Sequence, residues 1–177
     1  MRATRTRPTG VERTFGADEI IVTKTDPRGV ITYANEVFLR VSALTEAEAA
    51  GQPHSIIRHP DMPRAVFKLL WDTLGERQEI FAYVKNLAAD GAHYWVFAHV
   101  TPSFDAGGRL VGYHSNRRLP EKPVITRVSR LYDHLLAVEA RESSPKAATE
   151  AGRQALLAEL GGQTYDEYVW ALTSGAP

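Results

Sequence analysis

The sequence contains no cysteine, which excludes disulfide bonds, thiolate catalysis, cysteine-ligated zinc and iron–sulfur clusters. No apolar run approaches the roughly 18 residues of a membrane-spanning helix, and the arginine-rich start has no apolar segment of the kind found in secretory signals. Basic and acidic residues both number 21, so the net charge is zero, which argues against general adhesion to nucleic acids or membranes. We therefore expect a cytoplasmic protein that neither spans a membrane nor binds nucleic acid.

The first part of the chain predicts a hairpin followed by short helices. Residues 1–17 are polar and aperiodic, and we expect a flexible N-terminal segment there. Two β-rich runs, 20–25 and 30–33, flank Asp26-Pro27-Arg28-Gly29, whose proline and glycine are typical of a tight turn. Short helices are predicted at 34–41 and from Thr45.

The stretch Arg58-His59-Pro60-Asp61-Met62-Pro63 precedes the clearest helical pattern of the chain. Asp61 is expected to cap the helix through its carboxylate, and Pro63 suits the first turn, where a missing N–H costs little. The helix carries an apolar stripe formed by Val66, Phe67, Leu70, Trp71 and Leu74, and Gly75 is expected to end it. Such a stripe is more often core than a cofactor site.

Three strands are predicted next, over residues 80–87, 93–101 and 109–118, separated by turn sequences. Alternation places Trp95 on one face of the second strand with His93, Phe97 and His99. In the third strand, Val111, Tyr113, Ser115 and Arg117 share a face, and Gly112 suggests a bulge or a close backbone approach.

Pro120 and Pro123 mark a boundary, beyond which three further helices are predicted, from Val124, over 147–160 and over 165–172. The expected organisation is a flexible segment over 1–17, a folded domain over 18–118 and a C-terminal helical extension over 119–177. The fold class is α+β, with a five-stranded antiparallel sheet that carries short helices and one longer helix on one face. The space between helices and sheet is a natural site for a small molecule.

Several motifs, among them Ile31-Thr32-Tyr33-Ala34-Asn35 and the stretch 58–63, resemble those of the PAS domains of aerotaxis receptors, over about residues 18–118. The general PAS feature is Ile31-Thr32-Tyr33-Ala34-Asn35. The motifs more specific to aerotaxis receptors are Gly51-Gln52-Pro53-His54, the stretch 58–63 with Trp71, Val84-Lys85-Asn86, and Gly91 with His93-Tyr94-Trp95-Val96.

This resemblance implies a domain that holds FAD non-covalently and senses redox state or oxygen through it. It implies that the cofactor-binding residues are Asn35, Arg58, His59, Asp61, Trp71, Asn86 and Trp95. These residue types suit a flavin, because amides match its pyrimidine edge, a guanidinium matches its diphosphate and an aromatic ring can line the isoalloxazine pocket. The missing cysteine excludes adduct photochemistry of the LOV type.

One departure from the family keeps two alternatives open. Ile80-Phe81-Ala82 stands where the family commonly has Trp-Ser-Gly, so Phe81 or Tyr83 would have to replace the lost ring, or the pocket is altered. One alternative is a PAS domain that binds haem b through a histidine, for which the candidates are His54, His59, His93, His99 and His114. The other is a cofactor-free interaction module whose pocket is filled by side chains.

The sequence shows no nucleophile–base pair, carboxylate dyad or phosphate-binding loop, so we do not expect an enzyme, and a non-haem metal site has no support. The C-terminal helical extension is expected to be too short to form an output domain. We therefore expect signalling to a partner protein in trans. The first helix after the boundary could pack on the open sheet face or pair with a second copy, and we predict a homodimer.

Overall fold

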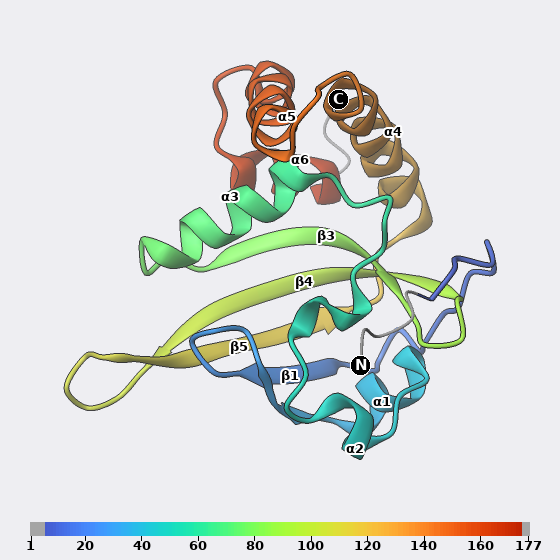
Figure 1. The fold of residues 1–177 in the computed structure, drawn as a ribbon, viewed down its shortest axis with the longest axis vertical. Helices are drawn as coiled ribbons and strands as arrows, with labels where there is room; N and C mark the ends of the chain where they lie inside the picture. The colour runs from blue at the N-terminus through green and yellow to red at the C-terminus, as the bar shows by residue number, and fades with distance from the viewer. Residues whose placement is uncertain (1–5, 175–177) are drawn as a thin grey trace.

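The computed structural model describes residues 6–174, and an α+β domain lies at its centre (Figure 1). Five strands form one antiparallel sheet in the order β2-β1-β5-β4-β3. Their bounds are β1 Ile21–Thr25, β2 Ile31–Ala34, β3 Ile80–Leu87, β4 His93–Phe104 and β5 Leu110–Arg118. The predicted fold class and all five predicted strands are confirmed.

Gly112 of β5 is a point of close approach between two strands. A Cβ atom at this position would lie 2.0 Å from the carbonyl oxygen of Thr25 on β1, so only glycine allows the two backbones to meet. The expectation of a close backbone approach is confirmed. It joins β1 to β5 at the centre of the sheet.

Four helical elements cover one face of the sheet. They are α1 Glu36–Ser42, α2 Glu46–Ala49, the 3₁₀ turn η1 His54–Ile57 and α3 Arg64–Gly75. Thr45 and Glu48 form the capping box that the sequence predicted for α2. The longer α3 buries Val66, Leu70 and Leu74 toward the sheet, as its stripe predicted.

The start of α3 differs from the prediction. Its N-cap is Pro63, and no side chain of its own segment caps it. The carboxylate of Asp61 instead accepts a hydrogen bond from Lys85 Nζ at 2.7 Å. The prediction that Asp61 caps α3 is therefore wrong, because the loop turns away along the edge of β3 and carries this carboxylate to Lys85.

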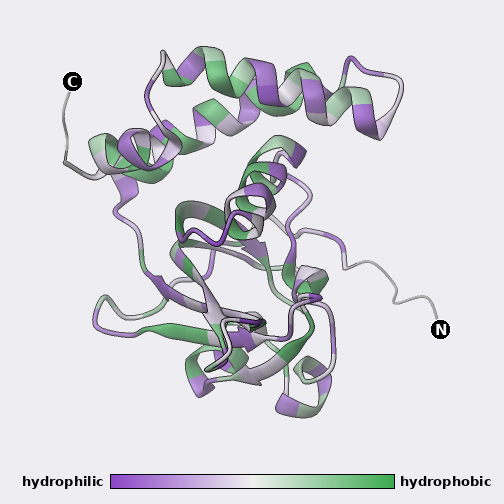
Figure 2. Ribbon diagram, turned by 90° about the vertical axis from the view of Figure 1, so that its left-hand side faces the viewer, coloured by the Kyte–Doolittle hydropathy of each residue, from purple (hydrophilic) through white to green (hydrophobic). Residues whose placement is uncertain are grey.

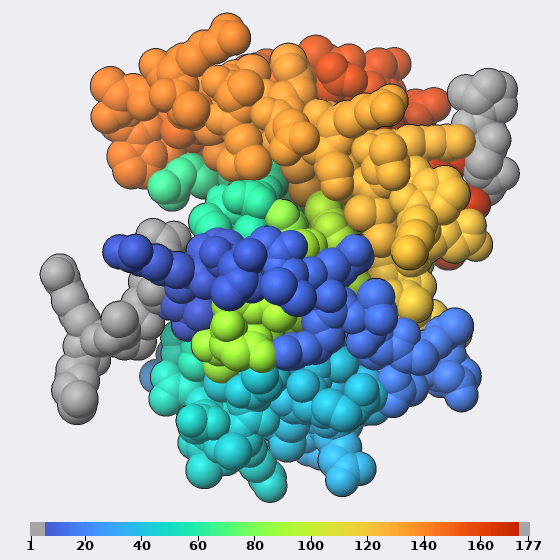
Figure 3. Space-filling model, turned by 90° about the vertical axis from the view of Figure 1, so that its right-hand side faces the viewer, coloured from blue at the N-terminus to red at the C-terminus, as the bar shows by residue number. Residues whose placement is uncertain are grey.

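The N-terminal segment lies against the sheet domain. Thr9 N donates to the carbonyl of Gly91 at 2.9 Å, Glu12 bridges to His93, and Phe15 is buried in the core. Figure 3 shows these residues, in blue, beside the turn between β3 and β4. The expectation of a flexible segment does not describe residues 9–15, and residues 1–5 lie outside the described part.

The C-terminal extension forms α4 Lys122–Glu139, α5 Pro145–Leu160 and α6 Tyr165–Ser174, as predicted. Tyr132 of α4 donates its hydroxyl to the carbonyl of Tyr83 on β3 at 2.6 Å, and its ring stacks on Trp95 of β4. Figure 2 shows α4 and α5 lying above α3, with the sheet below it. Within residues 6–174 no helix is both long and apolar enough to cross a bilayer.

Candidate ligand cavity

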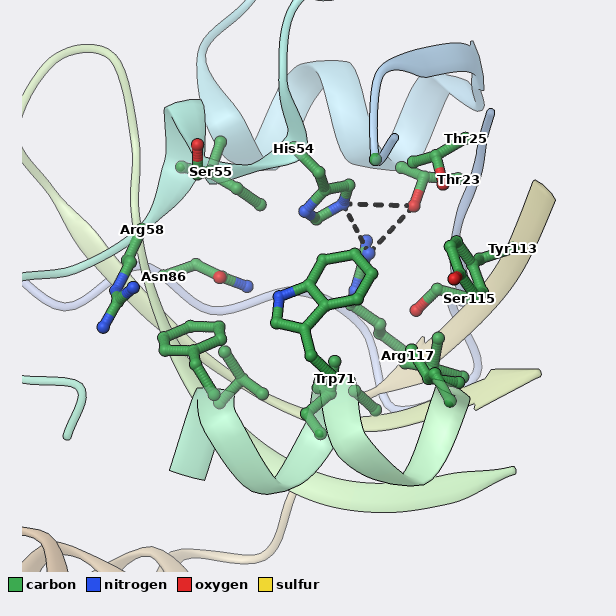
Figure 4. Close-up of a pocket in the computed structure, with 18 residues that line it drawn as sticks. Thr23, Thr25, His54, Ser55, Arg58, Trp71, Asn86, Tyr113, Ser115 and Arg117 are labelled. Carbon is green, nitrogen blue, oxygen red and sulfur yellow. Dashed lines mark hydrogen bonds between the residues drawn. The ribbon is translucent and has the colours of Figure 1, made fainter. Parts of the chain in front are cut away.

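A cavity of about 150 Å³ lies between α3, η1 and the helix-covered face of the sheet (Figure 4). Its apolar wall consists of Ile57, Phe67, Leu70, Trp71, Leu74, Val84, Ala98 and Val100. Its polar lining consists of Thr23, Thr25, His54, Ser55, Arg58, Asn86, Tyr113, Ser115 and Arg117, with the backbone of Gly29. A mostly apolar hollow with a few convergent polar groups is the usual form of a small-molecule site.

Three polar atoms of this lining are buried without a hydrogen-bond partner in the protein. They are Nδ2 of Asn86, Oγ of Ser115 and Nη1 of Arg117, and each residue is at most 5% exposed. Leaving a buried donor unpaired costs about 1–3 kcal/mol, more for a charged group. These atoms therefore favour a ligand that presents hydrogen-bond acceptors to them.

Arg117 is the centre of a small network at the closed end of the cavity. Its Nη2 donates to Thr23 Oγ1 at 2.8 Å and to His54 Nε2 at 2.6 Å (Figure 4). No carboxylate forms an ion pair with this guanidinium among residues 6–174. Burial lowers the pKa of Arg117 to about 10, so the group remains a cation at neutral pH.

His54 is neutral in this network. Burial, and then the positive charge of Arg117, lower the pKa of His54 to about 3. Because Nε2 accepts the bond from Arg117, the ring proton of the neutral imidazole is assigned to Nδ1. The network therefore holds one positive charge against the cavity, on Arg117.

Aromatic rings and a guanidinium form the mouth of the cavity. Trp71 is 46% exposed and meets the ring of Tyr113 edge-on, at 5.5 Å between centroids. On the other side, the guanidinium of Arg58 lies 4.0 Å from the ring centre of Phe67.

Three of the seven predicted cofactor residues line this cavity, namely Arg58, Trp71 and Asn86. Arg58 and Asn86 also form an antiparallel bridge, which ties the loop before α3 to the edge of β3. Their ligand contacts remain predictions, and the structure places all three where such contacts are possible.

Asn35 lies outside the lining because its amide is used within the fold. Its Oδ1 accepts from the backbone N–H groups of Phe38 and Val22, each at 3.0 Å, and its Nδ2 donates to the carbonyl of Ile20 at 2.8 Å. Asn35 therefore caps α1 and fastens it to β1, and the structure does not place it in contact with a cavity ligand.

His59 and Asp61 also lie outside the cavity lining. The backbone N–H of Asp61 donates to His59 Nδ1 at 3.1 Å, and Lys85 binds the Asp61 carboxylate. Burial, and then the charge of Lys85, lower the pKa of His59 to about 4. Burial would raise the pKa of Asp61, but the hydrogen bond and charge of Lys85 lower it overall. His59 and Asp61 thus stabilise the loop before α3 and do not form part of the cavity wall.

Trp95 points away from the cavity. Strand alternation places it on the opposite face of the sheet, where it is 7% exposed and stacks on Tyr132. Phe81 and Tyr83 face the same way, since Phe81 stacks on His99 and the hydroxyl of Tyr83 meets that of Thr173 at 2.8 Å. The expectations that Trp95 lines the pocket, and that Phe81 or Tyr83 replaces the lost family ring, are therefore wrong.

The strongest polar features of the cavity were not among the seven predicted cofactor-binding residues, although one of them, His54, was considered as a haem ligand. These are Arg117, Ser115, Tyr113, His54 and Thr23. The signal was present for three of them, because Tyr113, Ser115 and Arg117 alternate along one strand and a cation in such a series is unusual. Sequence alone did not tell which face of that strand looks into the cavity.

Of the five histidines considered for haem, His54 alone lines the cavity. Its Nε2 already accepts the bond from Arg117, and an iron there would have to displace that cation. Across residues 6–174 no three side chains of the ligand types His, Asp or Glu gather as a metal site would require.

Comparison with known proteins assigns the family. Residues 31–117 match the family model described as PAS fold. The chain is 40% identical over 120 residues to the aerotaxis receptor of Escherichia coli (strain K12), an alignment that covers 68% of this chain and 24% of that receptor. The chain carries a PAS domain of the aerotaxis-receptor type.

A second curated relative matches the chain over a similar length. A nitrogen fixation regulatory protein of Klebsiella pneumoniae is 31% identical over 121 residues, covering 68% of this chain and 24% of that protein. The chain thus spans about a quarter of the length of these curated relatives, 24% in each case.

Solved structures match the fold at low sequence identity. The light-state structure of the blue-light photoreceptor Aureochrome1 LOV matches with a TM-score of 0.54 at 20% identity, over 67% of this PAS chain and 91% of that one. The PAS domain of a protein from Colwellia psychrerythraea matches with a TM-score of 0.53 at 18% identity, over 58% and 87%. At these identities the matches show the PAS fold alone.

Proposed function

We propose that this PAS domain binds FAD non-covalently in the cavity and passes a redox- or oxygen-linked conformational signal to a protein partner in trans. The observation that carries the proposal is the set of unpartnered polar atoms on Asn86, Ser115 and Arg117 at a mostly apolar cavity. The likeness to an aerotaxis receptor supports the choice of a flavin and of a sensor role. No enzymatic step is part of the proposal.

The residues present fit a flavin. Asn86 and Ser115 would bind the polar edge of the isoalloxazine, the apolar side chains of α3 and β4 would enclose its ring, and Arg58 at the mouth would bind the diphosphate. When bound, FAD supplies the redox chemistry, because reduction changes the protonation and charge of its ring system. The fixed charge of Arg117 favours any added negative charge in the cavity.

Signal transfer would begin at Asn86. Its side-chain amide can present either a donor or an acceptor, so it can follow a change in the groups that face it. Asn86 pairs with Arg58 on one side of β3 and with Tyr94 on the other. A reorientation at this position therefore biases both the loop before α3 and the sheet, as a two-state switch requires.

The visible absorption spectrum of the purified chain tests the proposal. We expect a yellow protein, or one that becomes yellow on incubation with FAD. A folded preparation that stays colourless after that incubation contradicts it, and a Soret band indicates haem instead.

The cofactor-free alternative depended on side chains filling the pocket. That alternative named Ile80, Phe81 and Tyr83 as the filling residues, and in the structure none of the three lines the cavity. This alternative predicts a melting temperature that added flavin leaves unchanged, whereas a specific ligand raises it by mass action.

A homodimer remains a prediction. The structure shows α4 packed on the outer face of β3 and β4 within the same chain, through Tyr132. A second copy would therefore need another surface. Light scattering at micromolar concentration measures the mass of the protein in solution, and a monomeric mass would contradict the predicted homodimer.

A further inference from the structure

The N-terminus of α3 is capped by a residue from the C-terminal extension. The helix begins at Arg64 after Pro63, with no side-chain cap and no acidic residue in its first turn. Glu139, the last residue of α4, accepts hydrogen bonds from the backbone N–H of Arg64 at 3.0 Å and of Ala65 at 2.9 Å, one on each carboxylate oxygen. It thus satisfies two N–H groups that the helix leaves free.

The Glu139 carboxylate is buried, so it depends on the hydrogen bonds of this contact. Glu139 is 7% exposed, and a buried charge is costly unless it is hydrogen-bonded. Its position at a helix N-terminus adds a favourable interaction with the helix dipole, and bonds to an ionised acceptor are stronger than neutral ones. Removing either side of the contact therefore leaves the other unsatisfied.

Gly152 of α5 makes room for the same contact. A Cβ atom there would lie 2.6 Å from Glu139 Oε1 and 3.1 Å from Cβ of Ala65. Glycine within a helix costs about 1 kcal/mol relative to alanine, and here it permits the close meeting of three helices. This glycine lies at the position where α3, α4 and α5 meet around the Glu139 carboxylate.

Helix α3 lies between this contact and the cavity. One side of the helix contributes Phe67, Leu70, Trp71 and Leu74 to the cavity wall, and α5 packs along the other side (Figure 2). Because a helix of 12 residues moves largely as one body, a change in its N-terminal anchorage displaces the wall.

From this geometry we propose that Glu139 is a positioning residue of the cavity, which couples the docking of the α4–α5 hairpin to the state of the cavity through α3. The flavin part of this inference rests on the proposed function. Coupling is reciprocal, so a ligand that favours the α3 position seen here must also favour the docked hairpin. The extension would then be an element that reads the cavity.

The test compares Glu139→Gln with Glu142→Gln, an exposed carboxylate three positions further along. FAD affinity and amide hydrogen exchange are measured on the full chain. We expect Glu139→Gln to weaken FAD binding at least about fivefold, as a coupling of ordinary size requires. Exchange at α3 should rise, and FAD should slow exchange in α5 of the unmodified chain but not of this variant. Glu142→Gln should match the unmodified chain.

A second variant keeps the charge and disturbs only the packing. Gly152→Ala forces the carboxylate away from α3 and should reproduce the effect of Glu139→Gln on FAD affinity and on exchange. If both variants lower the melting temperature but bind FAD with unchanged affinity, Glu139 is a structural cap only and the inference is overturned.

The two proposals can fail separately. If the unmodified chain binds no FAD, the proposed function fails. The role of Glu139 is then tested by amide hydrogen exchange over residues 67–74 in the ligand-free chain. Faster exchange there in Glu139→Gln supports a positioning role for the cavity wall, and unchanged exchange overturns it.

Discussion

The two faces of the sheet are built from alternate residues of the same strands, yet they differ in how their polar groups are paired. On the outer face, the hydroxyl of Tyr132 donates to the Tyr83 carbonyl, and the hydroxyl of Tyr83 meets that of Thr173. On the inner face, Asn86, Ser115 and Arg117 keep buried atoms without a protein partner. The outer face is thus a completed internal interface, whereas the inner face is suited to a ligand.

This contrast predicts a division of effects between the faces. Substitutions on the inner face should change ligand binding more than stability, and substitutions on the outer face should do the reverse. The following predictions test that division, beginning with the largest expected effect.

Arg117→Met removes the buried cation of the inner face. We expect FAD affinity to fall about 10- to 150-fold, because a hydrogen bond to a charged group contributes about 1.5–3 kcal/mol. The melting temperature of the ligand-free chain should hold or rise, since burying an unpaired charge is costly. Isothermal titration and thermal denaturation measure the two effects. The exposed neighbour Arg118→Met is the control, and equal FAD affinity in both variants would contradict the assignment.

His54→Gln tests the neutral imidazole beside Arg117. The pKa of His54 is about 3 in the folded chain against an ordinary 6.5, so the unfolded state binds the extra proton first on acidification. The contribution of His54 to stability should therefore fall as the pH drops from about 6.5 toward 3, by about 1–2 kcal/mol between pH 7 and pH 5.

Glutamine keeps the acceptor for Arg117 but does not titrate, so His54→Gln should reduce this slope in urea denaturation. His59 leaves a residual slope of the same sign, because its pKa is also lowered, to about 4. The exposed His134→Gln should leave the slope as it is, and identical slopes in all three proteins would refute a buried neutral His54.

Two tryptophans give a matched pair across the sheet. Trp95→Phe should destabilise the chain by about 1–2 kcal/mol through lost ring burial and leave FAD affinity unchanged. Trp71→Phe at the exposed mouth should change stability by less than about 0.5 kcal/mol and weaken FAD binding about two- to tenfold. Thermal melts and flavin fluorescence titrations distinguish them. If Trp95→Phe weakened FAD binding and Trp71→Phe did not, the ligand would lie on the outer face.

Asn86→Ala removes an amide whose Nδ2 has no partner. FAD affinity should fall about two- to tenfold, as expected for loss of one neutral hydrogen bond. Stability should change little, because the group lost is unsatisfied in the ligand-free chain. Asn116→Ala on β5, whose Oδ1 bonds His114 Nε2 at 3.0 Å, is the matched control for the titration. No loss of affinity in Asn86→Ala would remove it from the site.

The sequence was sufficient for the fold because the relevant signals are local. The turn at 26–29, the stripe of α3 and the alternation of β4 and β5 each depend on residues near in the chain. The alternation even grouped Tyr113, Ser115 and Arg117 on one face. It could not say which face the helices cover, so Trp95 was placed in the pocket and Arg117 was not.

Contacts between distant segments were beyond such signals. Asp61 has the residue type and position of a helix cap, yet its carboxylate accepts a hydrogen bond from Lys85 instead. The cap comes from Glu139, 74 and 75 residues away from the two amides that it binds. Only the packing of the extension on α3 brings these groups together.

Equilibrium dialysis of the full chain against FAD tests the central claim most directly. The account predicts saturable, equimolar retention of FAD with a visible flavin spectrum, and greatly reduced retention in Arg117→Met. Retention of no FAD by a folded chain, or equal retention in both proteins, would contradict the assignment of the inner-face cavity as the flavin site.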